Sequence, residues 1–152
     1  MNGATGMYGF TPDILEHAVE IGIASGRVID VSFPRSLSGD AQDDHPLIDH
    51  LVTYFSGEQV TLAEVDIALT VDRDTRRVLE TVREISYGET VEAEALLRSA
   101  GFDPEEPADR TTVSTALSKN PVPILIPDHR IRGFNGAPPS EISRRLRALE
   151  QH

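Results

Sequence analysis

Three prolines within seven residues restrict the fold of this chain more than any other feature of its sequence. They lie in the segment 120–131. Each fixes its own φ at about −65° and lacks an N–H donor, so neither a regular helix nor a central strand can run through them. The middle of the segment, 124–126, is apolar enough to be buried, and Asp128, His129 and Arg130 follow closely. A rigid, irregular backbone that holds polar side chains against a core is what a functional site requires.

The composition limits the class of protein. A chain of 152 residues, 39% of them apolar, has room for one domain, or for a small domain with an appendage. No apolar run reaches the length of a membrane span, and the N-terminus lacks a signal pattern, so we expect a cytoplasmic protein with no membrane partner. The chain has no cysteine, which excludes disulfides, thiolate metal sites and every thiolate nucleophile.

The charge is acidic and unevenly spread. The formal net charge is −11, and Lys119 is the one lysine among 14 basic residues. We interpret this as adaptation to concentrated salt; the alternative is an ordinary acidic cytosolic protein. Residues 1–106 carry 7 basic and 21 acidic side chains and residues 107–152 carry 7 and 4, which gives formal balances of −14 and +3. The change of sign indicates an anionic partner for the C-terminal part.

The first 70 residues are expected to form a small α/β part. Residues 1–10 are Gly-rich and are expected to be frayed. Alternating apolar residues at 18–24 and again at 29–33, separated by Ser25-Gly26, predict a β-hairpin. Residues 45–55 have helical spacing, which predicts a helix with one buried stripe made of Leu47, Ile48, Leu51, Val52 and Phe55.

Two histidines near acidic residues raise the question of a metal site. His45 and His50 lie five residues apart, which is a poor spacing for one helix face. The acidic start of a solvated helix explains them better, so the sequence predicts no metal and no cofactor.

The remaining residues, 71–152, read as a helical part. The apolar spacing predicts helices at 72–85, at 91–100 with Thr90 as its cap, at about 109–118, and after Pro139 with Ser140 as its cap. The third helix would bury Val113, Ala116 and Leu117. This order fits a helix-turn-helix or winged-helix arrangement, whose last short helix docks on DNA. A plain helical domain with no nucleic-acid role fits the pattern equally well.

The segment 120–131 resembles the active-site segment of the methylated-DNA–protein cysteine methyltransferases, which repair alkylguanine in DNA. That family reads Asn-Pro-x-Pro-Ile-x-x-Pro-Cys-His-Arg-Val, and this chain departs at the reacting position, where Asp128 replaces the nucleophilic cysteine, and mildly at Ile131. Residues 84–91 are similar to the family's Ile-Pro-Tyr-Gly-Glu-Thr-Val-Ser, and Glu150 matches its closing glutamate. The similarity runs over about half the chain, and the family includes an alkyltransferase-like branch that lacks the cysteine and still binds DNA.

The resemblance implies roles for the matching residues. In the family, the cysteine, a histidine acting through water and the glutamate form a relay that activates the thiol. Here the resemblance implies that His129 and Glu150 remain as orienting groups with no thiol to activate. It also implies that Asn120 is a structural hinge. We expect Asp128 to be ionised near neutral pH, and a carboxylate is a far weaker nucleophile toward an alkyl carbon than a thiolate.

Three further departures argue against base flipping. By ungapped counting, the family's nucleotide-rotating tyrosine falls at Ala93, and its intercalating arginine falls at Thr111, one place from Arg110. The loop that walls the alkyl pocket is shortened to 136–139. The residues expected to contact DNA are Arg110, Thr111, Thr112, Ser114, Arg130 and Arg132.

The sequence thus predicts an α+β protein with a reduced N-terminal α/β part at 1–70, which contains the hairpin, and a helix-turn-helix or winged-helix-like alkyltransferase domain at 71–152. Three functions compete. The first is an alkyltransferase-like protein that binds duplex DNA, alkylated or not, and works with a DNA-repair protein, without transferring an alkyl group. The second is an interaction module that no longer touches DNA. The third, least favoured, is an enzyme that uses Asp128 and His129.

Overall fold

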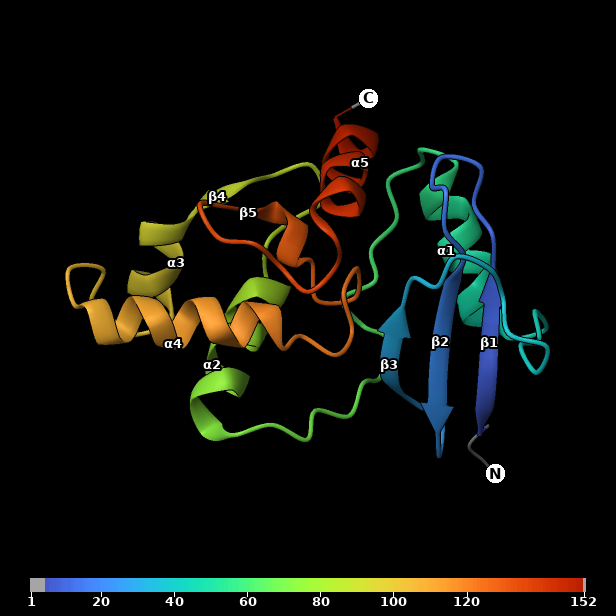
Figure 1. The fold of residues 1–152 in the computed structure, drawn as a ribbon, viewed down its shortest axis with the longest axis horizontal. Coiled ribbons are helices and arrows are strands. Elements are labelled where there is room, and N and C mark those ends of the chain that lie inside the picture. Colours follow the sequence, from blue (N-terminus) through green and yellow to red (C-terminus); the bar gives the residue numbers. More distant parts are fainter. Residues whose placement is uncertain (1–4, 152) are drawn as a thin grey trace.

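The computed structural model describes residues 5–151. Its N-terminal part is an antiparallel sheet of three strands, β1 (Gly6–Phe10), β2 (Val19–Ala24) and β3 (Arg27–Ser32), in the order β1-β2-β3. The helix α1 (Pro46–Phe55) lies beside the sheet (Figure 1). The predicted hairpin is confirmed as β2–β3, and both of its turn residues, Ser25 and Gly26, have positive φ, as a type I′ turn requires.

The expected fraying of residues 1–10 is wrong for residues 6–10, and residues 1–4 lie outside the described residues. Residues 6–10 form β1, which pairs with β2 along its whole length. The outer edge of β1 is covered too, because the N–H of Gly9 donates to the carbonyl of Gln42 at 2.8 Å. The other edge of the sheet is closed by residues 66–68, which bond to both backbone groups of Val28. A sheet with both edges covered resists pairing with another chain.

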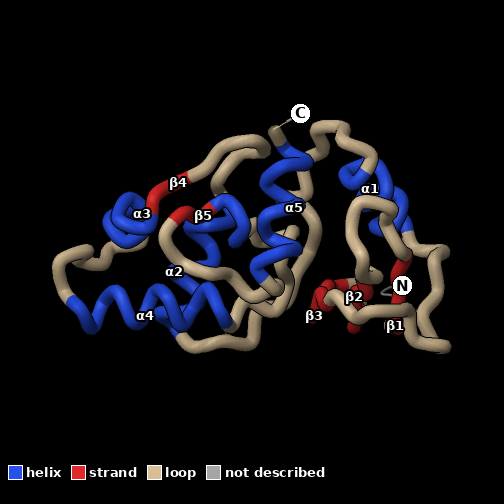
Figure 2. Tube along the Cα trace, turned by 45° about the horizontal axis from the view of Figure 1, so that its top comes forward, coloured by secondary structure: helices blue, strands red, loops and turns tan. Residues whose placement is uncertain are grey.

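The C-terminal part is mostly helical. It consists of α2 (Arg73–Arg83), β4 (Val91–Glu92), α3 (Ala93–Ser99), α4 (Pro107–Ser118), the short 3-10 turn η1 (Asp128–Arg130), β5 (Ile131–Arg132) and α5 (Ser140–Glu150). Figures 1 and 2 place α5 between this helical part and the sheet with α1. None of the described helices is long and apolar enough to cross a membrane.

The helix predicted at 91–100 begins two residues later, at Ala93. Val91 and Glu92 instead pair in parallel with Ile131 and Arg132, so Thr90 is not a helix cap. A tertiary pairing that joins segments forty residues apart has overridden the local helical spacing. At α5, the cap is Pro139 and Ser140 is the first helical residue.

The buried residues of α4 and α1 are those predicted, with one difference in α1. Val113, Ala116 and Leu117 of α4 are buried, as predicted. In α1, however, Val52 is 48% exposed, and Tyr54 is buried in its place. Tyr54 packs edge-on against Phe55 and Tyr87, so its aromatic ring gains contacts that a valine would not.

One hydrophobic core runs through both parts, and the proline-rich segment lies inside it. Its buried residues include β-strand, helix and loop side chains, and Val122, Ile124, Leu125 and Ile126 are all among them. The N–H of Val31 in β3 donates to the carbonyl of Pro121 at 2.8 Å, which joins the sheet to this segment. Ile124 has φ of 77°, a conformation that a β-branched residue adopts only under strong constraint.

Candidate functional site

Asn120 holds the irregular segment in shape. Its side chain is buried, and its Nδ2 donates to the carbonyl of Ile126 at 2.9 Å and to Oδ2 of Asp128 at 3.0 Å. Its Oδ1 accepts from the N–H of Val122 at 3.0 Å. Because three prolines leave this backbone without regular hydrogen bonds, one amide side chain supplies them.

Glu150 accepts five hydrogen bonds and forms the centre of a buried cluster. The donors are Tyr54 Oη at 2.5 Å, His129 Nε2 at 2.7 Å, Arg130 Nε and Nη2 at 2.8 and 2.9 Å, and the N–H of Gly88 at 3.2 Å. We call these five residues the Glu150 cluster. It ties α5 to α1, to the turn after α2 and to η1.

The cluster fixes the protonation of its members. Burial alone would raise the pKa of Glu150, but the hydrogen bonds from His129 and Arg130 outweigh it and hold that pKa well below its ordinary value. Burial, reinforced by the neighbouring carboxylate, raises the pKa of Tyr54 well above its ordinary value. Glu150 therefore stays ionised and Tyr54 stays a donor. An ionised Glu150 also keeps the proton of the imidazole on Nε2 of His129.

Arg130, one of the residues expected to contact DNA, is largely buried in the structure. It is 9% exposed, and its guanidinium donates to both oxygens of Glu150 and, from Nη1, to the carbonyl of Ile85 at 2.6 Å. Its plane also lies over the ring of Tyr87, at 5.7 Å from the centroid. These partners tie Arg130 to Glu150 and to the turn after α2.

Asp128 has different hydrogen-bond partners from those of Glu150. Its Oδ2 accepts from Asn120 Nδ2 and from the N–H of Ala137 at 2.8 Å, and both donors are neutral. Burial raises the pKa of Asp128 above its ordinary value of 3.8, although these two hydrogen bonds and nearby His129 oppose the shift. The carboxyl therefore keeps its proton to higher pH than the sequence suggested. We call Asp128, Asn120, Gly136 and Ala137 the Asp128 corner.

Three buried polar atoms beside this corner have no hydrogen-bond partner among the described residues: Asp128 Oδ1, His129 Nδ1 and Ser143 Oγ. All three residues line one cavity of about 30 Å³, at the start of α5. A histidine with one ring nitrogen held by a carboxylate and the other open to a cavity can accept or pass a proton there. Sequence reasoning missed Ser143, because a serine beside Ile142 gives no signal that its hydroxyl points inward.

A larger cavity does not contain these groups. It measures about 520 Å³ and lies between residues 59–63, residues 83–87 and the side of the proline-rich segment formed by Ile124 and Leu125. Neither Asp128 nor His129 lines it. Volume alone therefore does not mark the site, and we locate the site by its polar groups.

The α4 surface carries most of the other predicted residues. Thr111 and Arg132 are exposed, and Thr112 and Ser114 are half-buried. The guanidinium of Arg110 lies over the ring of Phe134, 5.5 Å from its centroid, and donates to the carbonyl of Pro104.

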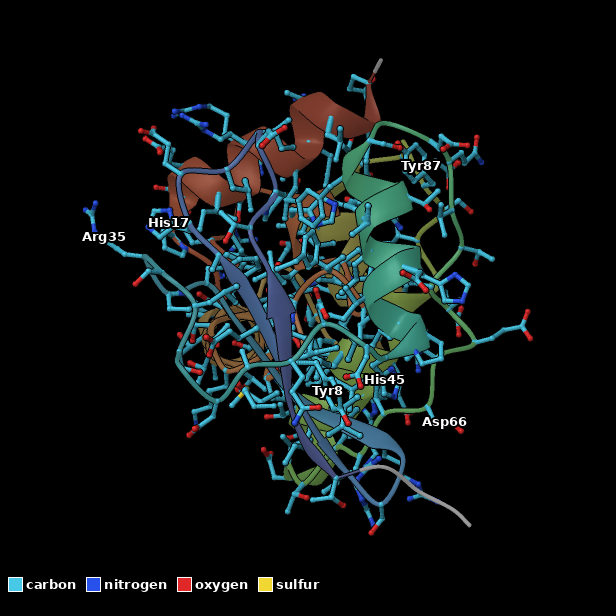
Figure 3. All side chains as sticks on the ribbon, turned by 90° about the vertical axis from the view of Figure 1, so that its right-hand side faces the viewer. Tyr8, His17, Arg35, His45, Asp66 and Tyr87 are labelled. Carbon is cyan, nitrogen blue, oxygen red and sulfur yellow. The ribbon has the colours of Figure 1, made fainter. Side chains whose placement is uncertain are left out.

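The structure thus brings Asn120, Asp128, His129 and Glu150 together and places the α4 residues outside that site. No cluster of possible metal ligands is found among the described residues. His45, weighed earlier as a ligand, caps α1 by accepting from the N–H of Leu47 and lies beside Tyr8 (Figure 3).

Comparison with known proteins agrees with this arrangement. The sequence profile described as "6-O-methylguanine DNA methyltransferase, DNA binding domain" matches residues 74–151. Methylated-DNA–protein-cysteine methyltransferases from Metallosphaera sedula and Methanopyrus kandleri are 32% and 34% identical to this chain over 108 and 92 residues. These matches cover 68% and 60% of this chain and 65% and 66% of the two relatives, so the chain spans slightly less than two thirds of their length.

Solved structures show the same fold. The R37L variant of the Mycobacterium tuberculosis O6-methylguanine methyltransferase matches with a TM-score of 0.78 at 22% identity, over 97% of this chain and 93% of that one. The O6-methylguanine-DNA methyltransferase of Pyrococcus kodakaraensis matches with a TM-score of 0.69 at 18% identity, over 98% and 100%. Fold and sequence together define a protein of the DNA alkyltransferase class. More narrowly, the chain belongs to the 6-O-methylguanine DNA methyltransferase family, and the predicted mixed α/β fold is confirmed.

Proposed function

We propose that this chain is an alkyltransferase-like DNA-binding protein, related to DNA repair, that does not transfer a methyl group. The observation that carries the proposal is Asp128, which stands at the position of the family's nucleophile in a chain with no cysteine at all. A buried carboxyl that accepts two hydrogen bonds and has a raised pKa is a poor attacking group for an alkyl carbon. The neighbouring His129–Glu150 pair keeps its orientation with no thiol to activate.

The surface supports a role on DNA. The α4 helix is twelve residues long and presents Thr111 and Thr115 to solvent, with Arg110 at its first turns and Arg132 exposed on β5. Small hydroxyl side chains allow close approach to a groove. A solved structure of the Mycobacterium tuberculosis relative is described as a complex with DNA, and it matches this chain with a TM-score of 0.76 at 22% identity.

The proposal takes residues 71–152 as the DNA-binding part, with α3 and α4 as a helix-turn-helix pair. The local charge favours this assignment, because residues 107–152 carry a balance of +3 in a chain of net charge −11. A cytoplasmic location and a DNA-repair protein as partner are predictions that accompany it. The competing interaction module would have the same fold and no affinity for DNA.

Fluorescence anisotropy with a labelled duplex tests the proposal. We expect Arg110→Ala to weaken binding by about tenfold or more, because it removes a cation from α4, the helix proposed to dock on DNA. The matched control is Arg144→Ala, which removes an exposed arginine of α5 and should change the dissociation constant by less than about twofold.

Two measurements on wild type extend the test. The logarithm of the binding constant should fall only shallowly with the logarithm of salt concentration, as expected when few phosphates are neutralised. The mass of the protein should not change after incubation with methylated DNA. Absence of duplex binding at moderate salt would favour the interaction module instead.

A further inference from the structure

A short loop lies over Asp128, and it bears on which DNA this protein can recognise. We call residues 133–139 the closing loop. We propose that the closing loop bars an extrahelical base from the site, so that the protein binds duplex DNA with every base stacked and does not select alkylated guanine. This inference rests on the proposed function and adds the class of substrate.

The first anchor of the closing loop is the Asp128 carboxyl. Ala137 donates its N–H to Oδ2 at 2.8 Å. At the preceding residue, Gly136, an added Cβ would lie 2.4 Å from the carboxyl carbon of Asp128 and 2.6 and 2.7 Å from its oxygens. The loop backbone therefore presses directly on the carboxyl group, and only glycine permits that approach.

The second anchor joins the start of the closing loop to α3. Gly133 has φ of 104°, and a Cβ added there would lie 3.1 Å from the Cβ of Ala93. Ala93 is itself only 5% exposed. A large side chain at position 93, such as the family's tyrosine, would collide with the loop in this position. The small residue and the inward loop are thus mutually dependent.

The third anchor joins the closing loop to α4. Phe134 lies under the guanidinium of Arg110, whose Nη1 also donates to the carbonyl of Pro104. A cation held over an aromatic ring is attracted by the negative face of the ring. Arg110 is therefore engaged with the loop and is not projecting freely as a side chain that could replace a base in the stack.

The space that these three anchors leave is too small for a base. The cavity between Asp128, His129 and the closing loop measures about 30 Å³. A cavity of this size has room for a water molecule or two. A purine is far larger, and it must also be unstacked and unpaired before it can leave the duplex. Entry would require the closing loop to move off Asp128, so recognition is left to the outer surface of α4 and to the duplex in its stacked form.

Two measurements on the same complexes separate this inference from the proposed function. Anisotropy reports binding to duplexes that contain O6-methylguanine or guanine at one position. A third duplex carries 2-aminopurine there, whose fluorescence rises when the base leaves the stack. For wild type we expect dissociation constants that agree within about twofold and no rise in 2-aminopurine fluorescence.

Variants locate the cause in the closing loop. Asp128→Ala removes the first anchor, so the amide of Ala137 should exchange its hydrogen faster, and a preference for the methylated duplex should emerge. Asn135→Ala changes an exposed residue of the same loop that makes no anchor contact, and it should behave as wild type. Hydrogen exchange at Ala137 in wild type should stay slow when DNA is bound, a result that does not depend on any variant folding.

The outcomes are distinct. Wild-type preference for the methylated duplex by about tenfold, or a rise in 2-aminopurine fluorescence on binding, would overturn the inference and leave DNA binding intact. Failure of wild type to bind any duplex would instead remove the proposed function on which the inference rests.

Discussion

Two carboxyl groups are buried within one region of this protein, and their surroundings push them in opposite directions. Glu150 meets a guanidinium, an imidazole, a phenol and a backbone N–H, and its pKa is depressed. Asp128 meets two neutral N–H donors, leaves one oxygen without a partner, and its pKa is raised. Both side chains are nearly inaccessible, at 6% and 1% exposure, so burial alone does not explain why the two pKa values move in opposite directions.

The comparison shows what a buried carboxyl needs in order to remain charged. Desolvation opposes ionisation at both sites, and only the Glu150 cluster supplies positive charge within hydrogen-bond distance to outweigh it. The Glu150 cluster is thus built around an anion. The Asp128 corner tolerates a carboxyl that replaces the family's nucleophile, and it uses that carboxyl to hold a loop.

The largest effect should come from breaking the Glu150 cluster. Glu150→Ala leaves Arg130 and His129 buried without their acceptor, and we expect the free energy of unfolding to fall by about 3–5 kcal/mol. Urea unfolding measures this as a shift of the midpoint. The control is Glu141→Ala on the same helix, whose carboxylate is 48% exposed and pairs with Arg145 at 3.6 Å, and which should cost less than about 1 kcal/mol. Equal losses in the two variants would mean that the cluster is no more than a surface-like ion pair.

Acid should remove the contribution that ionised Glu150 makes to the stability of the fold. Its folded pKa is depressed below the ordinary value of 4.5, so its contribution to stability is present above about pH 4.5 and is lost as pH falls through the folded pKa. The stability gap between wild type and Glu150→Gln should therefore narrow below about pH 4.5, by up to about 1.4 kcal/mol per pH unit. Urea midpoints across the acid range measure it. A gap that stays constant with pH would contradict the depressed pKa.

Asp128→Asn should have the smallest effect and the opposite pH dependence. The asparagine oxygen can accept both existing hydrogen bonds at the Oδ2 position, and its amide can face the cavity. Because the pKa of Asp128 is raised, its contribution is present below about pH 3.8 and is lost as pH rises through the folded pKa. At neutral pH the variant should match wild type or exceed it by about 1 kcal/mol, with the difference vanishing in acid. A variant that is weakest at neutral pH would show that an ionised Asp128 is favoured in the fold.

Local signals in the sequence were enough to predict the helices and the β2–β3 hairpin, because their apolar spacing and turn residues depend on near neighbours. The pairing of His129 with Glu150 came from the motif, since nothing local joins residues 21 apart. The strand at 6–10 and the β4–β5 pair could not be predicted, because a Gly-rich or two-residue strand is defined only by its distant partner. The burial of Arg130 could not be predicted for the same reason, because an arginine in a basic region is expected to be exposed until its acceptor is known.

The anchors of the closing loop lay beyond sequence reasoning altogether. The sequence shows Ala93 and the shortened loop as departures from the family that together argue against base flipping, and it gives no sign that the two are in contact. In the structure Ala93 touches Gly133, and Gly136 touches Asp128, so the departures fit one another. Such complementarity is visible only in the folded chain, which brings Ala93 and Gly133, forty residues apart, into contact.

The hydrogen bond between Tyr54 and Glu150 also bears on how the chain folds. It joins residues 96 apart, and Arg145 reaches the carbonyl of Ile14 across 131 residues. Closing loops of that length is entropically slow and gives no stabilisation until both ends are ordered. The sheet with α1 and the helical part should therefore gain their final stability in one late, cooperative step. An intermediate that lacks this step would leave Glu150 and Arg130 solvated, so the site would assemble only as folding ends.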